Sequence, residues 1–157
     1  MLFQGIIKGM EFITDSAKQT QKLAAKIIEE AAAKKTGGAL VLALQGELGA
    51  GKITFVQGLA KALGVKERIL SPTFVIMKHF NILTFKRFSN FYHIDCYRIE
   101  NPRELMELRF TKIVADPKNI VTIEWAEKIK KSLPEKTIWL KFEHRGEDER
   151  SIKISNG

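Results

Sequence analysis

The stretch "ALVLALQGELGAGKITFVQGLAKALG" (39–64) predicts a buried strand, a glycine-rich loop and a helix in direct succession. Residues 39–45 are a continuous apolar run of strand length, which is typical of a strand covered on both faces of a parallel sheet. After the loop, apolar residues recur at helical spacing until Gly64 ends the pattern: Phe55, Val56, Leu59, Ala60 and Leu63. This is the structural context that a phosphate-binding loop requires.

The loop follows the Walker A pattern, in which Gly46 is followed by four residues and then by Gly51 and Lys52. Its glycines allow successive backbone N–H groups to point at phosphate oxygens, and the positive end of the next helix adds to that field. Lys52 is expected to reach the β- and γ-phosphates. The alternative is a plain glycine turn. The expected phosphate-binding residues are Gly46, Glu47, Leu48, Gly49, Ala50, Gly51, Lys52, Ile53 and Thr54.

The residue after Lys52 departs from the pattern. Ser or Thr normally stands there and its hydroxyl holds Mg²⁺, whereas this chain has Ile53. Thr54 is one position further along the helix and therefore points about 100° away. Backbone binding of phosphate should survive this change, but the placement of magnesium should suffer.

Two further strands carry acidic residues. "NIVTIEW" (119–125) predicts a buried strand that ends in Glu124, where a carboxylate can bind the metal through water or orient the attacking water. In "YHIDCYR" (92–98), alternation places His93, Asp95 and Tyr97 on one face. Asp95 is expected to face a wet functional cleft, because aspartate is disfavoured inside strands. We interpret His93 as structural and Cys96, on the other face, as a small core residue.

The remaining elements predict a mixed α/β sheet. A helix is expected within 14–38, capped by Asp15 or Ser16 and ended by Gly37-Gly38. Another should start at Asn101-Pro102, and a short one should precede Pro134. The expected strands are 73–80, 90–97 and, as a closing hairpin, 137–143 with 150–155.

The composition indicates a single domain that spans residues 1–157. A chain of 157 residues with 45% hydrophobic content can build one core, and no linker or repeat is visible. No apolar run has the length to cross a bilayer, and the start lacks the basic region of an export signal. The single cysteine agrees with a cytoplasmic location. The net charge of +8 permits contact with RNA, but the lysines are dispersed and are better explained by solubility.

Four stretches occur in order: "GELGAGK" (46–52), "SPTF" (71–74), "HIDCYR" (93–98) and "IEW" (123–125). Together they resemble the TsaE family, formerly the YjeE type, which are small bacterial ATPases needed to make threonylcarbamoyladenosine in tRNA. The phosphate loop alone would be unspecific, whereas the four motifs at these spacings are highly specific. The resemblance covers most of the chain, about 14–155.

The resemblance implies a P-loop NTPase-like domain: a mixed, mostly parallel sheet with helices on both faces and a C-terminal hairpin. It implies ATP or ADP and Mg²⁺ as cofactors, with Lys52 in the ATP-phosphate loop. Glu124 matches the Walker-B-like magnesium carboxylate, and Trp125 the neighbouring functional tryptophan. Asp95 matches an aspartate tied to nucleotide hydrolysis, which we also expect to help hold the metal.

The resemblance further implies that Thr73 is a switch-like residue near the terminal phosphate and that Thr20 and Arg150 lie around the adenine. The implied partners are TsaB- and TsaD-like proteins, with tRNA nearby through the complex and no membrane. TsaD carries out the transfer chemistry, and the TsaE-like ATPase supports repeated turnover. The family reads G-K-T-T where this chain has Gly51 to Thr54 with isoleucine at the first threonine.

Three functions stay open at this point. The first is an ATP-binding accessory protein whose hydrolysis is weak or depends on partners. The second is a non-hydrolysing, nucleotide-dependent binding module, which the loss of the hydroxyl at Ile53 would most simply produce. The third, a small-molecule kinase, is disfavoured because no segment forms an obvious arginine-rich lid. The preference for ATP over GTP rests on the resemblance, and contact with tRNA and contact with a partner protein both stay open for the basic segment around Lys86 and Arg87.

Overall fold

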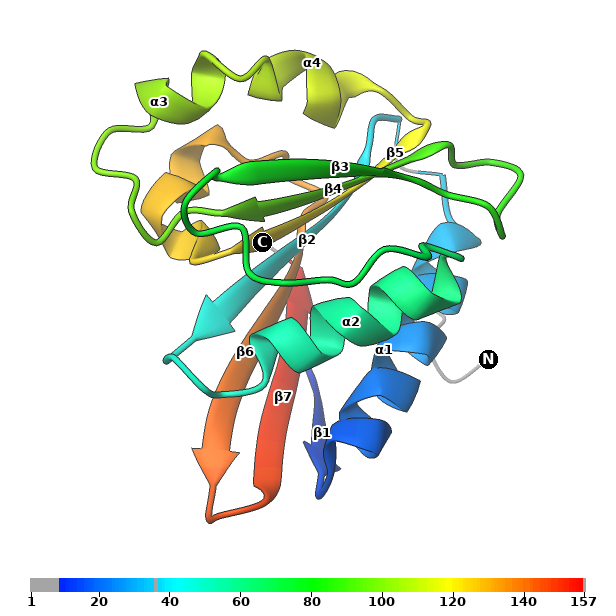
Figure 1. Ribbon diagram of the computed structural model, residues 1–157, viewed down its shortest axis with the longest axis vertical. Helices are drawn as coiled ribbons and strands as arrows, with labels where there is room; N and C mark the ends of the chain where they lie inside the picture. The colour runs from blue at the N-terminus through cyan, green and yellow to red at the C-terminus, as the bar shows by residue number, and fades with distance from the viewer. Residues whose placement is uncertain (1–8, 36, 157) are drawn as a thin grey trace.

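Seven strands form one mixed sheet in the computed structural model, which describes residues 9–35 and 37–156 (Figure 1). Their order across the sheet is β1-β7-β6-β2-β5-β4-β3. The strands are β1 Met10–Thr14, β2 Leu40–Gly46, β3 Met77–Asn81, β4 Asn90–Asp95, β5 Asn119–Glu124, β6 Ile138–Arg145 and β7 Glu149–Asn156. The helices are α1 Ala17–Ala32, α2 Lys52–Ala62, α3 Arg103–Met106, α4 Phe110–Ala115 and the 3₁₀ helix η1 Ala126–Ser132.

The four central strands run parallel. Strand β2 pairs in parallel with β5 and β6, and β5 pairs in parallel with β4. The outer strands β3, β7 and β1 are antiparallel to their neighbours. Because β2 lies at the centre, its first five residues are all buried, which explains its unbroken apolar sequence. The predicted mixed sheet with a closing β6–β7 hairpin is confirmed.

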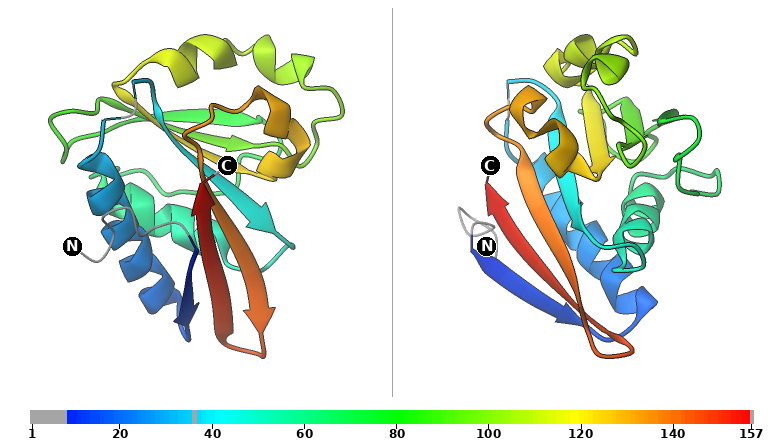
Figure 2. Two further views of the ribbon diagram at one scale, coloured as in Figure 1. Left: turned by 180° about the vertical axis from the view of Figure 1, so that it is seen from behind. Right: turned by 90° about the vertical axis from the view of Figure 1, so that its left-hand side faces the viewer.

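Helices cover both faces of the sheet (Figure 2). Alternate residues of β2 contribute to two cores: Leu42 and Leu44 pack with α1 and α2, whereas Val41 and Ala43 pack with α3, α4 and η1. The sheet is therefore the central layer between two layers of helix. Within the described residues, no helix combines the length and apolar character needed to cross a membrane.

Helix α1 begins where the sequence predicts. The side chain of Ser16 accepts a hydrogen bond from the Gln19 backbone N–H at 3.1 Å, which caps the helix. The helix ends at Ala32, earlier than the predicted Gly37-Gly38. The reason is that the next two N–H groups bond to carbonyls three residues back, so the last turn tightens and stops.

The strand predicted over 73–80 begins only at Met77. The backbone N–H groups of Val75 and Ile76 both donate to the Pro72 carbonyl, at 3.1 and 2.7 Å, and so form a turn. Ile76 has a φ of 67°, which is costly for a β-branched residue. The turn overrides local strand propensity and places Thr73 in a loop beside β4.

Two other regions also differ from the sequence prediction. Strand β1 was not expected; it pairs with β7 at the sheet edge and brings Thr14 opposite Arg150. The helix expected from Asn101-Pro102 is only four residues long. It stops before Arg109, whose left-handed φ of 62° separates it from α4.

Candidate functional site

The predicted phosphate loop joins β2 to α2, and its residues 47–49 are exposed. Its glycines have positive φ: 148° at Gly46, 80° at Gly49 and 103° at Gly51. A Cβ at Gly46 would lie 2.5 Å from the Phe142 carbonyl oxygen, so no larger residue fits there. The loop therefore needs these glycines for its shape, as the sequence pattern predicts.

Lys52 is the first residue of α2, and its side chain folds back along the loop. Only 4% of the residue is exposed, its Nζ donates to the Gly46 carbonyl, and its ammonium lies 4.0 Å from the centre of the Trp125 ring. Burial lowers the pKa of Lys52, while nearby carboxylates, led by Glu124, act in the opposite direction. A cation is thus held inside the loop.

Asp95 and Glu124 end neighbouring parallel strands and lie opposite one another in the β4–β5 register. Both are buried, with 3% and 5% exposure. Asp95 does not face a wet cleft, contrary to expectation. Its Oδ2 accepts hydrogen bonds from the hydroxyls of Ser71 and Thr73, each at 2.8 Å, so the 71–73 segment covers it. Those hydroxyls satisfy the buried charge without bulk water.

Glu124 has a partner that sequence reasoning missed. Its Oε2 lies 2.7 Å from Nε2 of His93, which is fully buried. The sequence alone predicts a structural role for His93, since a lone histidine gives no signal of a carboxylate partner. The one available clue was its position two residues before Asp95, on the same face of the strand.

Trp125 has a left-handed φ of 56° at the point where β5 passes into η1. Its ring lies 5.2 Å from that of Tyr97 and also contacts the Lys52 ammonium. The indole therefore sits between the phosphate loop and the end of β4. Because of this contact, the fluorescence of Trp125 should change when the Lys52 ammonium moves.

Ile53 and Thr54 follow Lys52 in the first turn of α2. Ile53 is partly buried and packs against the core beneath α1 and α2. Both residues line a pocket of about 280 Å³ that also includes Thr20 and Arg150. The structure thus gathers these predicted residues beside the loop, even though Thr20 is on α1 and Arg150 is on β7.

The carboxylates of Asp95 and Glu124, at adjacent strand ends, are the candidate oxygen donors for a metal. Mg²⁺ keeps several waters and usually binds one or two carboxylates together with substrate phosphates. Asp95 and Glu124 suit that donor set, whereas Ile53 supplies no oxygen. No cluster of three metal-binding side chains exists among the described residues.

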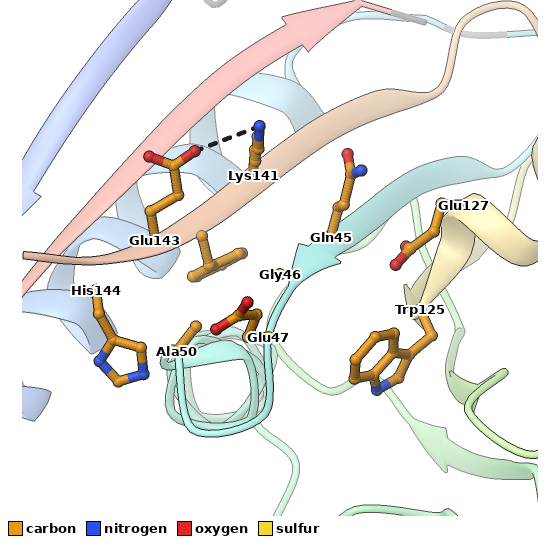
Figure 3. A pocket seen from close by; sticks show the side chains of 10 residues that line it. Gln45, Gly46, Glu47, Ala50, Trp125, Glu127, Lys141, Glu143 and His144 are labelled. Carbon is orange, nitrogen blue, oxygen red and sulfur yellow. Dashed lines mark ion pairs between the residues drawn. The ribbon is translucent and has the colours of Figure 1, made fainter.

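A larger groove of about 510 Å³ borders the loop on the β6 side (Figure 3). Three glutamates line it, namely Glu47, Glu127 and Glu143, and Lys141 is paired with Glu143 at 3.3 Å. Carboxylates repel phosphate, and the smaller pocket also has two of them, Asp15 and Asp148, beside Arg150 and the loop residues Gly49 and Gly51. Size alone does not identify the site.

Cys96 takes no part in this chemistry. It is fully buried, and burial followed by the charge of Asp95 raises the pKa of its thiol to about 12. Iodoacetamide should therefore leave the folded chain unlabelled between pH 7 and pH 9, while the unfolded chain is labelled fully. Intact mass spectrometry checks this, since Cys96 is the chain's single cysteine. Equal labelling rates before and after unfolding would contradict the assignment.

A strand, a loop with left-handed glycines, a helix and two carboxylates at adjacent strand ends define an α/β protein with a P-loop-like fold. A model of the family "Threonylcarbamoyl adenosine biosynthesis protein TsaE" matches residues 14–152. The chain belongs to the TsaE family, whose role lies in the biosynthesis of threonylcarbamoyladenosine in tRNA.

Individual members of the TsaE family are similar to this chain over most of its length. The chain is 36% identical over 117 residues to Bacillus subtilis TsaE, covering 73% of this chain and 68% of that protein. It is 30% identical over 150 residues to Treponema pallidum TsaE, covering 93% and 100%. The crystal structure of Bacillus subtilis YdiB superposes with a TM-score of 0.69 at 30% identity, covering 96% and 87% of the two chains.

Proposed function

We propose that this protein is a cytoplasmic ATP-binding accessory subunit for threonylcarbamoylation of tRNA, with weak or partner-dependent hydrolysis. The observation that carries the proposal is Lys52, a buried cation held inside a glycine loop beside two buried carboxylates. A buried cation within a glycine loop that opens a helix is suited to a polyphosphate. TsaB- and TsaD-like proteins are the proposed partners, and tRNA is reached through them.

Each part of the site has a proposed task. Residues 46–54 bind the phosphates, with Lys52 on the β- and γ-phosphates. Thr20 and Arg150 line the smaller pocket and contact the base. Trp125 packs against Lys52 and keeps its ammonium oriented toward the loop.

Asp95 and Glu124 are the proposed holders of Mg²⁺, which would neutralise phosphate charge when bound. Glu124 also orients the attacking water, using the carboxylate oxygen that His93 does not engage. With Ile53 in place of a hydroxyl, the protein contributes fewer oxygen ligands than a standard loop of this type. Slow turnover by the isolated chain follows from that deficit.

The chain contains two tryptophans, so Trp139→Phe leaves Trp125 as a single reporter next to Lys52. ATP and ADP with Mg²⁺ should change its emission to saturation, and GTP should compete less well. Phosphate release should be slow for the chain alone and faster with TsaB- and TsaD-like partners. Unchanged emission together with no heat of binding in calorimetry would refute nucleotide binding.

A second candidate is a nucleotide-dependent binding switch without turnover. The hydroxyls of Ser71 and Thr73 are bonded to Asp95, and the next two residues, Phe74 and Val75, are 86% and 56% exposed. A nucleotide or metal that engages Asp95 would release this segment and move its apolar residues. Partner binding that requires nucleotide, with no phosphate release, would select this candidate over the first.

A further inference from the structure

His93 occupies an unusual position for a polar residue. It lies within β4, is fully buried, and faces Thr122 across the β4–β5 pairing. Neighbouring positions on the same face, Phe91 and Ile120, are apolar and pack in the core. An apolar side chain of similar size would avoid the cost of burying an imidazole there, so the ring calls for a chemical explanation.

The hydrogen bond to Glu124 defines the form of the ring. An ionised carboxylate can only accept, so Nε2 of His93 carries the proton and donates to Oε2 over 2.7 Å. In the neutral ring, Nδ1 is then a bare acceptor. Nδ1 of His93 and the Thr122 hydroxyl are both buried, and neither has a hydrogen-bond partner among the described residues. The two unpartnered atoms belong to residues that lie opposite one another in the β4–β5 register.

We propose that His93 is a positioning residue for Glu124, with the Thr122 hydroxyl holding the imidazole in the Nε2-protonated tautomer through one water. The inference rests on the proposed function of Glu124. His93 engages Oε2, which leaves Oε1 free of hydrogen bonds from the described residues and available to water or metal. A partner that orients a functional carboxylate commonly affects activity as strongly as loss of some ligands does.

Orientation matters here because Glu124 has a like-charged neighbour. Asp95 lies opposite it in the strand register, and the repulsion between the two carboxylates favours rotation of Glu124 away from the site. Asp95 is held by Ser71, Thr73 and the Tyr97 backbone N–H. His93 is the corresponding restraint on Glu124.

The test compares His93→Leu, which removes the donor, with His93→Gln, whose amide keeps a donor near the position of Nε2. With the native chain and its partners, the leucine variant should lower kcat about 10- to 100-fold while KM stays within about twofold. The glutamine variant should recover most of that loss. Affinity for a fluorescent ADP in EDTA should be the same in all three. His79→Leu, on the exposed histidine that bonds Asn90, is the matched control and should match the native chain.

Nitrogen NMR of the histidine side chains provides a readout independent of turnover. His93, assigned by the signal missing from His93→Gln, should show a proton on Nε2 and none on Nδ1. Glu124→Gln and Thr122→Val should each shift this signal. Equal loss of kcat in both His93 variants, a proton on Nδ1, or a spectrum insensitive to Glu124→Gln would overturn the inference. Failure of the native chain to bind nucleotide would instead refute the proposed function.

Discussion

Replacing Lys52 by methionine should weaken nucleotide binding by about 10- to 100-fold. Methionine keeps an unbranched stem against Trp125 but removes the ammonium that would contact the phosphates. Hydrogen bonds to charged groups contribute roughly 1.5–3 kcal/mol, which corresponds to this range of affinity. Calorimetric titration with ADP measures the change. The free energy of unfolding should not fall, because burial already disfavours the Lys52 charge and lowers its pKa.

Lys61→Met is the matched control, since Lys61 lies in the last turn of the same helix and is exposed. It should bind ADP like the native chain. Because phosphate favours the charged form of Lys52, affinity should also decline as pH rises through that lowered pKa, and Lys52→Met should lose this dependence. Equal weakening in both methionine variants would argue for a general charge effect.

Restoring a hydroxyl with Ile53→Thr should raise magnesium-dependent phosphate release by about tenfold or more, in line with the typical contribution of a metal-positioning residue. Ile53→Val is the matched control because valine has the shape of threonine without the hydroxyl. Both replacements remove part of the packing of Ile53 against the core, at a cost of about 0.5–1.5 kcal/mol for valine. Their difference therefore isolates the hydroxyl.

The rates should be measured for each variant alone and with TsaB- and TsaD-like partners, and ADP affinity in EDTA should be equal among them. If only the threonine variant hydrolyses ATP while all variants bind nucleotide, the native chain is a binding switch built on an ATPase fold. If the native chain and the threonine variant hydrolyse ATP at equal rates, the metal is held without a ligand at position 53. The predicted increase in phosphate release would then be wrong.

Local segments were predictable because their conformations depend mainly on their own residues. The apolar run before Gly46, the glycines and the helix of Lys52 form one contiguous unit, and each part has a characteristic pattern. The same is true of the strand that ends at Glu124. The predicted strand start at Thr73 was wrong, because the turn around Pro72 and the hydroxyl bonds to Asp95 outweigh β propensity there.

Contacts between strands were not predictable in the same way. The pairing of β4 with β5 places His93 beside Glu124, and the pairing of β1 with β7 places Thr14 opposite Arg150. Neither pairing has a signature within one segment, because strand order depends on how apolar faces are buried across the whole sheet.

The amino-acid sequence was sufficient for the strand, the glycine loop and the helix around Lys52, which are one contiguous segment, and its four motifs were sufficient for the class of fold. The burial of Asp95 beneath Ser71 and Thr73, the bond from His93 to Glu124 and the pocket shared by Thr20 and Arg150 arose only on folding. They join residues distant in the chain, and the packing of the sheet and its helices is what brings such residues within bonding distance.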